Sequence, residues 1–178
     1  MHEPPADVLQ QDDLLEALER LVTEGKIRRY GVASHPTVVG FALDAGLETF
    51  QFPCNLFDLG VAQMFGGRSN DVVAIANHPF GGGQQIAEDK ALLTSIALYP
   101  KAPASLREKL RTVDNAVLAD VVLNAITHDT GVQIVVPSMM QPNHLRANIA
   151  AIEQSRFSSE ELQWMCHAIA RHKHPADI

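Results

Sequence analysis

Four short apolar runs, each followed at once by polar or glycine residues, are the feature that most constrains the fold of this chain. In order they read IRRYGVASH, FQFPCNLFD, VVAIANHPFGGG and VQIVVPSMMQPNHLRANIAAI. Helical patterns separate them, and strands that alternate with helices call for a parallel sheet with right-handed crossovers. A (β/α) barrel presents ligand groups in this way, at the carboxyl ends of its strands.

The local patterns predict the boundaries of these elements. An amphipathic helix starts near Asp12 and stops at Gly25, a second runs from Pro36 to Gly46, and a third opens at Pro142. Ser158 and Glu161 have the spacing of a capping box for the last helix. We expect strands at 27–33, 50–54, 72–76 and 132–136, and further helices at 84–99 and 105–128.

Length and composition predict a single domain over residues 1–178, with 46% hydrophobic and 20% charged residues. No apolar stretch is long enough to span a bilayer, and the acidic N-terminus lacks the pattern of a secretory signal. The net charge of −7 disfavours nonspecific binding to nucleic acid. Cys54 and Cys166 are too few for a disulfide framework, so we expect structural thiols in a cytoplasmic protein.

The number of strands predicts an incomplete barrel. Residues 1–5 lead directly into a helix and leave no room for earlier strands, so we expect an N-terminally truncated chain, or a fragment whose Met1 is no true start. Four parallel strands amount to half of a TIM-type (β/α)8 barrel and leave open edges at 27–33 and 132–136. Such edges invite pairing, so a homodimer that closes an eight-stranded barrel is one hypothesis.

In order and spacing, the four runs resemble the aldo-keto reductases over nearly the whole chain. EGKIRRYGVASH is similar to the fifth strand of that family, which usually reads EGKIR and then GVSN. FQFPCNLFD resembles the sixth strand with its Gln, and VVAIANHPFGGG the seventh with its PLGGG loop. VVPSMMQPNHLRANIAAI is similar to the eighth strand and the following helix.

This resemblance implies NAD(P)H-dependent reduction of an aldehyde or ketone. The nicotinamide gives a hydride to the carbonyl carbon, while a Tyr, helped by Lys, Asp and His, supplies the proton. Only His2 matches this catalytic set, with a frayed terminal residue as the alternative. Tyr30 and Tyr99 are the only tyrosines and neither lies at the family's position. Whether the chain is an enzyme by itself therefore stays open.

The same resemblance implies that the nicotinamide and pyrophosphate contacts are largely retained. Ser34 and Gln51 match residues that hold the nicotinamide carboxamide, and amides suit that role because they both donate and accept. Asn77 falls near a position where many members stack a Tyr on the ring, so the stacking surface is lost and we expect cofactor binding to be weakened or lost. The pyrophosphate loop is matched by Pro79, Phe80, Gly81, Gly82 and Gly83, where glycines allow close backbone approach; a plain turn is the alternative.

At the adenosine end, Ser138 and Met139 match the segment that reaches the adenosine phosphate. His144 stands where many members have an Arg, and Asn148 matches an Asn that contacts adenine. Members of the family that prefer NADP usually carry a Lys or Arg here, because the 2′-phosphate of NADP favours charge-assisted hydrogen bonds. That Lys is missing from this sequence, so the cofactor can be NADP or NAD. Met140 belongs to the same segment, and both methionines could instead be loop or core packing, while Asn148 could be a surface residue.

Two other functions compete with a reductase. His2, His35 and His78 would lie just past strand ends, where barrel hydrolases bind zinc, but they form no HxH or HExxH pair and we expect no metal site. The second alternative is a non-catalytic nucleotide-binding or structural, oligomerising half-barrel protein. For the enzyme, the expected partners are a nicotinamide dinucleotide and a small carbonyl substrate.

Overall fold

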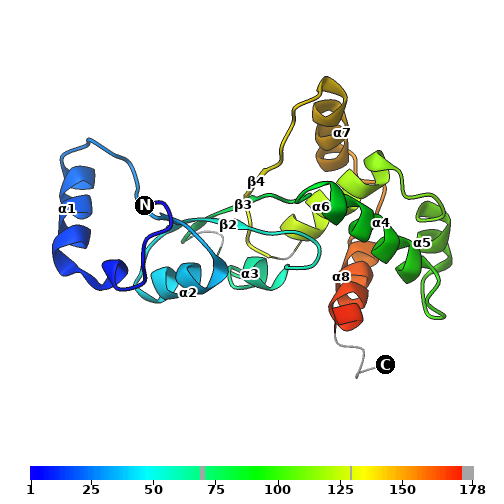
Figure 1. The fold of residues 1–178 in the computed structure, drawn as a ribbon, viewed down its shortest axis with the longest axis horizontal. Coiled ribbons are helices and arrows are strands. Elements are labelled where there is room, and N and C mark those ends of the chain that lie inside the picture. The colour runs from blue at the N-terminus through cyan, green and yellow to red at the C-terminus, as the bar shows by residue number, and fades with distance from the viewer. Residues whose placement is uncertain (69–70, 129, 174–178) are drawn as a thin grey trace.

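A parallel sheet forms the centre of the computed structural model, which describes residues 1–68, 71–128 and 130–173 (Figure 1). Its four strands lie side by side in chain order. They are β1 (Val32–Ala33), β2 (Thr49–Pro53), β3 (Val73–Asn77) and β4 (Ile134–Val136). All three neighbouring pairs are parallel, which confirms the predicted α/β arrangement of four parallel strands.

The first strand is shorter than the range 27–33 predicted from the sequence. In the register of the β1–β2 pair, Val32 lies opposite Phe50, and β2 begins only at Thr49. Residues 27–30 of the predicted strand therefore have no strand beside them and form neither helix nor strand. Gly31 itself lies so close to the Thr49 carbonyl that a Cβ would collide with it. The close crossing fixes where the ladder starts.

The N-terminal residues lead into η1 and α1 with no strand before them, as expected, but they also pair with the edge of the sheet. The Met1 ammonium donates to the Gly31 carbonyl at 2.6 Å, and the Ala33 N–H donates to the Met1 carbonyl at 2.8 Å. The Glu3 N–H donates to the Ala33 carbonyl at 2.7 Å. His2 thereby forms a parallel bridge with Ala33, and the edge of β1 is already occupied.

Helices surround the sheet and give the molecule an elongated shape (Figure 1). A 3₁₀ turn, η1 (Val8–Gln10), precedes α1 (Asp12–Thr23) at one end, followed by α2 (Pro36–Asp44) and α3 (Gly60–Gln63). The other end is built from α4 (Gly83–Ala97), α5 (Ala104–Lys109), α6 (Asn115–Thr127), α7 (Pro142–Glu153) and α8 (Ser159–Lys173). Among the described residues, no helix combines the length and apolar character that crossing a membrane requires.

The helix predicted over 105–128 is wrong, because the chain forms two helices there. Between α5 and α6 the carboxylate of Asp114 accepts a hydrogen bond from the Val117 N–H at 2.8 Å. This is an N-cap, which stabilises the start of a new helix. The capping box of α8 is confirmed: Ser158 N–H donates to Glu161 Oε2 at 2.9 Å, and Glu161 N–H donates to Ser158 Oγ at 3.2 Å.

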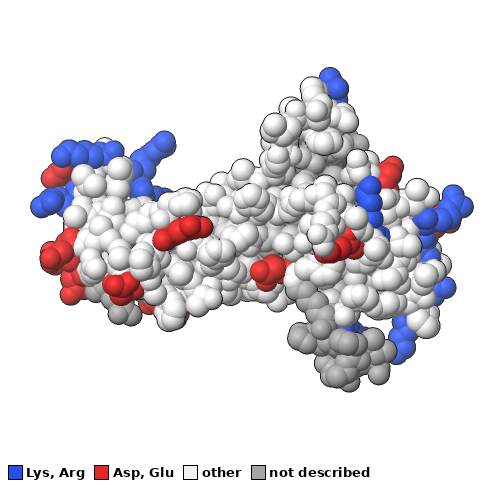
Figure 2. Space-filling model, in the orientation of Figure 1, with Lys and Arg blue, Asp and Glu red and all other residues white. Residues whose placement is uncertain are grey.

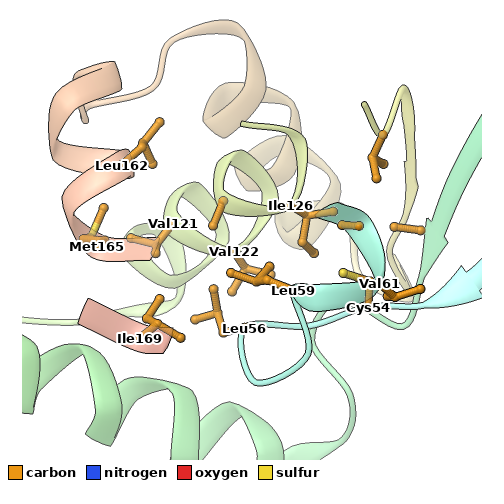
Figure 3. Close-up of a cluster of buried hydrophobic side chains, with 14 of the residues drawn as sticks. Cys54, Leu56, Leu59, Val61, Val121, Val122, Ile126, Leu162, Met165 and Ile169 are labelled. Carbon is orange, nitrogen blue, oxygen red and sulfur yellow. The ribbon is translucent and has the colours of Figure 1, made fainter. Parts of the chain in front are cut away.

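One face of the sheet is the core. Phe50 and Phe52 lie on the same face of β2, two residues apart, and are fully buried. The Phe65 ring stacks on Phe52 with centroids 5.1 Å apart. The core continues between α6 and α8, where Val121 and Met165 lie near the connection after β2 (Figure 3). Cys54 belongs to this part of the core, and its Sγ donates to the Asp58 carbonyl at 3.3 Å.

The other face of the sheet is partly open. Gln51 and Ile75, which alternate with the buried residues, are half-buried and lie opposite each other. On β4 the exposed fractions of Ile134 and Val136 are 45% and 49%. In a closed barrel such positions face the interior, where side chains from all strands fill the space.

Candidate functional site: a glycine-lined cavity between three helices

A cavity of about 360 Å³ opens where the N-terminal ends of α4, α6 and α7 approach one another. Seven of the residues predicted to bind a cofactor line it: Phe80, Gly81, Gly82, Gly83, Ser138, His144 and Asn148. They come from two loops that are far apart in sequence, one after β3 and one after β4, and from the first turns of α7. Parallel pairing of β3 with β4 brings these two loops to the same edge of the sheet.

The three glycines of the loop after β3 play different parts. Gly81 has a φ of +55°, in the left-handed region that favours glycine, and its N–H closes a turn onto the His78 carbonyl at 3.0 Å. Gly82 and Gly83 have no positive φ, and a Cβ added to either would meet no heavy atom within 4 Å. A plain turn explains Gly81 alone, whereas the other two keep the cavity open.

These glycines also form the start of α4. Gly82 is its N-cap, and no side chain caps the helix, so first-turn N–H groups remain without an intrahelical acceptor. Helix N-termini with free N–H groups attract anions, because the donors and the helix dipole both favour negative charge. The start of α4 is therefore suited to a phosphate group.

Asn148 is the polar group most deeply set in the cavity wall. Its exposed fraction is 7%, so it is not the ordinary surface residue considered above. Its Nδ2 is buried and has no hydrogen-bond partner among the described residues. An unpaired buried donor lowers stability, so such an atom at a cavity wall is suited to a ligand acceptor.

The rest of the wall is mostly apolar, and sequence reasoning missed all of it except Met140. These lining residues are Ile86, Asn115, Leu118, Ala119, Met140 and Ala147. Met140, rather than Met139, lines the cavity, and exposed fractions of 86% and 45% exclude both from core packing. Asn115 was hidden because the start of α6 was not predicted. The available signal was Asp114, a favoured N-cap residue directly before an apolar helical run.

The remaining predicted site residues lie outside this cavity, towards the sheet. His2 and Gln51 are both in register with Ala33, on its two sides, and therefore share the open face of the sheet. Ser34 is buried, and its N–H donates to the Gln51 carbonyl at 3.0 Å. Asn77 ends β3, and its buried Oδ1 has no partner among the described residues. Of the other two, Pro79 is buried behind the glycine loop and Met139 is exposed.

Neither tyrosine is placed to act at the cavity. Tyr30 lines a different hollow of about 400 Å³, together with Arg28, Arg29 and Glu48. Burial, followed by the charges of Glu19 and Glu48, raises the pKa of Tyr30, whereas an acid catalyst needs a lowered pKa. Tyr99 packs edge-on against Trp164, and its hydroxyl lies 3.0 Å from His172 Nδ1.

Charge is unevenly distributed around the site. Figure 2 shows basic side chains over the end of the molecule that carries α4 and α5, while the middle of the same face has few charged groups.

On α4, burial raises the pKa of Asp89 to about 6, with a further increase from Glu88 and an opposing hydrogen bond from Gln85. Over the residues with described positions, no three His, Cys, Asp or Glu side chains gather as metal ligands do.

The fold resembles solved structures of an aldo-keto reductase. The aldo-keto reductase AKR11C1 from Bacillus halodurans, in its holo form, superposes with a TM-score of 0.62 at 20% identity, covering 94% of this chain and 58% of that one. Its apo form gives 0.60 at 21% identity, with coverage of 88% and 56%. This chain thus spans little more than half the length of these structures, and the likeness confirms the predicted partial TIM-type barrel.

The sequence itself gives the family. A search of curated proteins found no significant match. The model of the aldo/keto reductase family matches residues 1–169, which is nearly the whole chain. The chain therefore belongs to the aldo/keto reductase family.

Proposed function

We propose that the cavity binds the pyrophosphate and adenosine of a nicotinamide dinucleotide, NADP or NAD, and that residues 1–178 act as one domain in doing so. The unpaired Nδ2 of Asn148 is the observation that carries this proposal, because it offers a buried donor to a ligand base. Gly82 and Gly83 leave room for the pyrophosphate at the start of α4. Phe80 and Met140 supply apolar surface for a flat ring.

The nicotinamide would lie towards the open face of the sheet. Gln51, in the middle of β2, offers an amide to the carboxamide, and Asn77 adds a buried oxygen that has no partner among the described residues. Such amides orient a ring by donating and accepting together. When bound, the reduced nicotinamide supplies a hydride for an aldehyde or ketone.

Proton transfer is the step for which this chain offers least. We propose His2 as the one catalytic group, supported by its bridge to Ala33 beside Gln51. The Asp, Tyr and Lys that the family uses have no counterpart at matching positions in this sequence. Carbonyl reduction would therefore need a proton donor from outside residues 1–178, in a reducing, cytoplasmic setting that suits the two thiols.

Glycine substitutions test the dinucleotide proposal directly. Gly82→Ala and Gly83→Ala each place a methyl group in open space, so the fold should be unchanged while affinity for NADPH and NADH falls about tenfold or more. Gly60→Ala is the matched control, because a Cβ there also meets nothing within 4 Å but lies in α3. Fluorescence titration of the nicotinamide measures both. Equal affinities in all three variants would contradict the proposal.

A second candidate is a non-catalytic, oligomerising protein, and the exposed residues of β4 favour it. Ile134 and Val136 lie at a free sheet edge, and α7 exposes Leu145, Ile149 and Ile152 at helical spacing on one face. We propose a second copy of this chain as the occupant, because its Met1–Glu3 segment provides a parallel edge that β4 can pair with.

Two measurements separate these candidates. A dimer by light scattering at micromolar concentration, lost in Ile134→Lys, would support the second copy, and a monomer would count against it. Oxidation of NADPH or NADH with a panel of aldehydes would favour the enzyme. Binding of dinucleotide without turnover would favour the non-catalytic protein.

A further inference from the structure

Lys90 reaches the rim of the cavity from the side of α4. Its Nζ donates to Asn115 Oδ1 at 2.7 Å, and Asn115 is the first residue of α6 and part of the cavity wall. Ile86, one turn before Lys90 on the same face of α4, also lines the cavity. The ammonium is thus fixed beside the cavity by a residue that lies 25 positions further along the chain.

The charge of Lys90 is available to a ligand. No carboxylate among the described residues forms an ion pair with it, and the nearby Asp114 carboxylate is engaged as the N-cap of α6. An ammonium has three donors, so the bond to Asn115 leaves others for an anion. Because Asn115 Oδ1 accepts from Lys90, the NH₂ of the same amide also remains a donor.

The position of Lys90 sets it apart from the pyrophosphate site. It follows Gly83 by seven residues, which corresponds to about 10 Å along the helix axis. The two points on α4 would therefore contact two separate anionic groups. A dinucleotide with a third phosphate on its adenosine ribose offers such a pair of groups, and one without it does not.

We propose that Lys90, positioned by Asn115, binds the 2′-phosphate that distinguishes NADP(H) from NAD(H). This inference rests on the proposed function, because it takes the cavity to be the dinucleotide site. It assigns the missing cation to α4 rather than to the segment after β4. Charge-assisted hydrogen bonds to phosphate are the stronger class of hydrogen bond, so the preference for NADPH should depend on this side chain.

The experiment compares the dissociation constants of NADPH and NADH for the full chain by fluorescence titration. We expect Lys90→Gln to weaken NADPH about tenfold or more and to leave NADH within about twofold. Asn115→Ala should lower the NADPH preference less, because the ammonium stays but is no longer held. Lys101→Gln, an exposed lysine between α4 and α5, is the control and should change neither constant.

Several results would overturn the inference. One is equal affinity of the wild-type protein for NADPH and NADH. Another is an equal loss of affinity for both dinucleotides in Lys90→Gln. A third is a selective loss of NADPH affinity in Lys101→Gln, or in Arg146→Gln on α7. Wild-type protein that binds neither dinucleotide would refute the proposed function itself. As a measurement without substitution, added salt should weaken NADPH more steeply than NADH, and parallel slopes would contradict the role of Lys90.

Discussion

The side chain of Gln133 accepts the hydrogen bond from Ala74 N–H that a neighbouring strand would otherwise accept. The Ala74 N–H donates to Gln133 Oε1 at 2.7 Å, and the Gln133 N–H donates to the Ala74 carbonyl at 3.2 Å. Gln133 Nε2 also donates to the Val72 carbonyl at 3.0 Å. The glutamine thus extends the β3–β4 pairing by one step and fixes the start of β4, which leads to Ser138 at the cavity.

Replacing Gln133 should loosen this pairing. Gln133→Ala removes the side-chain hydrogen bonds to Ala74 and Val72 and leaves the Ala74 N–H without its acceptor, so we expect unfolding free energy to fall by about 1–3 kcal/mol in urea titration. Gln163→Ala, at an exposed position on α8, should change it by less than about 0.5 kcal/mol. Equal losses of unfolding free energy in the two variants would mean that the hydrogen bonds of the Gln133 side chain do not stabilise the sheet.

Asp120 joins α6 to the chain that enters α8. It is 1% exposed, and its carboxylate accepts from Ser155 Oγ at 2.7 Å and from both the main-chain N–H and Nε of Arg156 at 3.0 Å. Asp120→Ala leaves these donors unpaired, so we expect a loss of about 3–5 kcal/mol in unfolding free energy. Glu108→Ala breaks an exposed pair with Arg111 and should cost less than about 1 kcal/mol. Losses of similar size would contradict this distinction.

Asp89 should make stability fall as pH rises through the mildly acid range. Burial raises its pKa from 3.8 to about 6, so between these values the folded chain binds more protons than the unfolded chain. The penalty is absent below about pH 4 and reaches roughly 2–3 kcal/mol above pH 6. Asp89→Asn should match wild type near pH 4 and exceed its unfolding free energy at pH 8. Parallel pH profiles of the two proteins in urea would argue against a buried, neutral Asp89.

Asn148 should show opposite effects on stability and on binding. Asn148→Leu removes the unpaired Nδ2 and keeps the number of side-chain heavy atoms, so we expect a gain of about 1 kcal/mol in unfolding free energy and a loss of dinucleotide affinity of about tenfold. Asn143→Leu, on the exposed side of α7, should leave the affinity unchanged. A variant with lower stability and unchanged affinity would mean that the amide has a structural partner.

Much of the fold could be predicted from apolar periodicity, because β2 and β3 alternate strictly between the core and the open face. Phe50 and Phe52 define that pattern without any tertiary knowledge. The length of β1 could not be predicted, since it depends on where Gly31 crosses Thr49 in a neighbouring strand. The break before α6 was missed because its apolar residues continue the helical spacing across Asp114.

The site was predictable to the extent that its residues follow strands. Gly81 to Gly83 and Ser138 were expected to meet because parallel strands end at one edge, and they do line one cavity. Lys90 and Asn115 come from helices whose mutual placement no local pattern specifies. Their contact arises from the packing of α4 on the end of α6, which the sequence does not display.

The cavity draws its walls from α4, α6 and α7, and this origin has a practical result. A molecule that fills it would contact parts of the chain that are distant in sequence and would therefore bind only the folded form. By mass action, saturation at a hundred times the dissociation constant would add about 2.7 kcal/mol to folding. A simple melting curve, recorded with and without each candidate compound, would therefore report occupancy without any label or enzymatic readout.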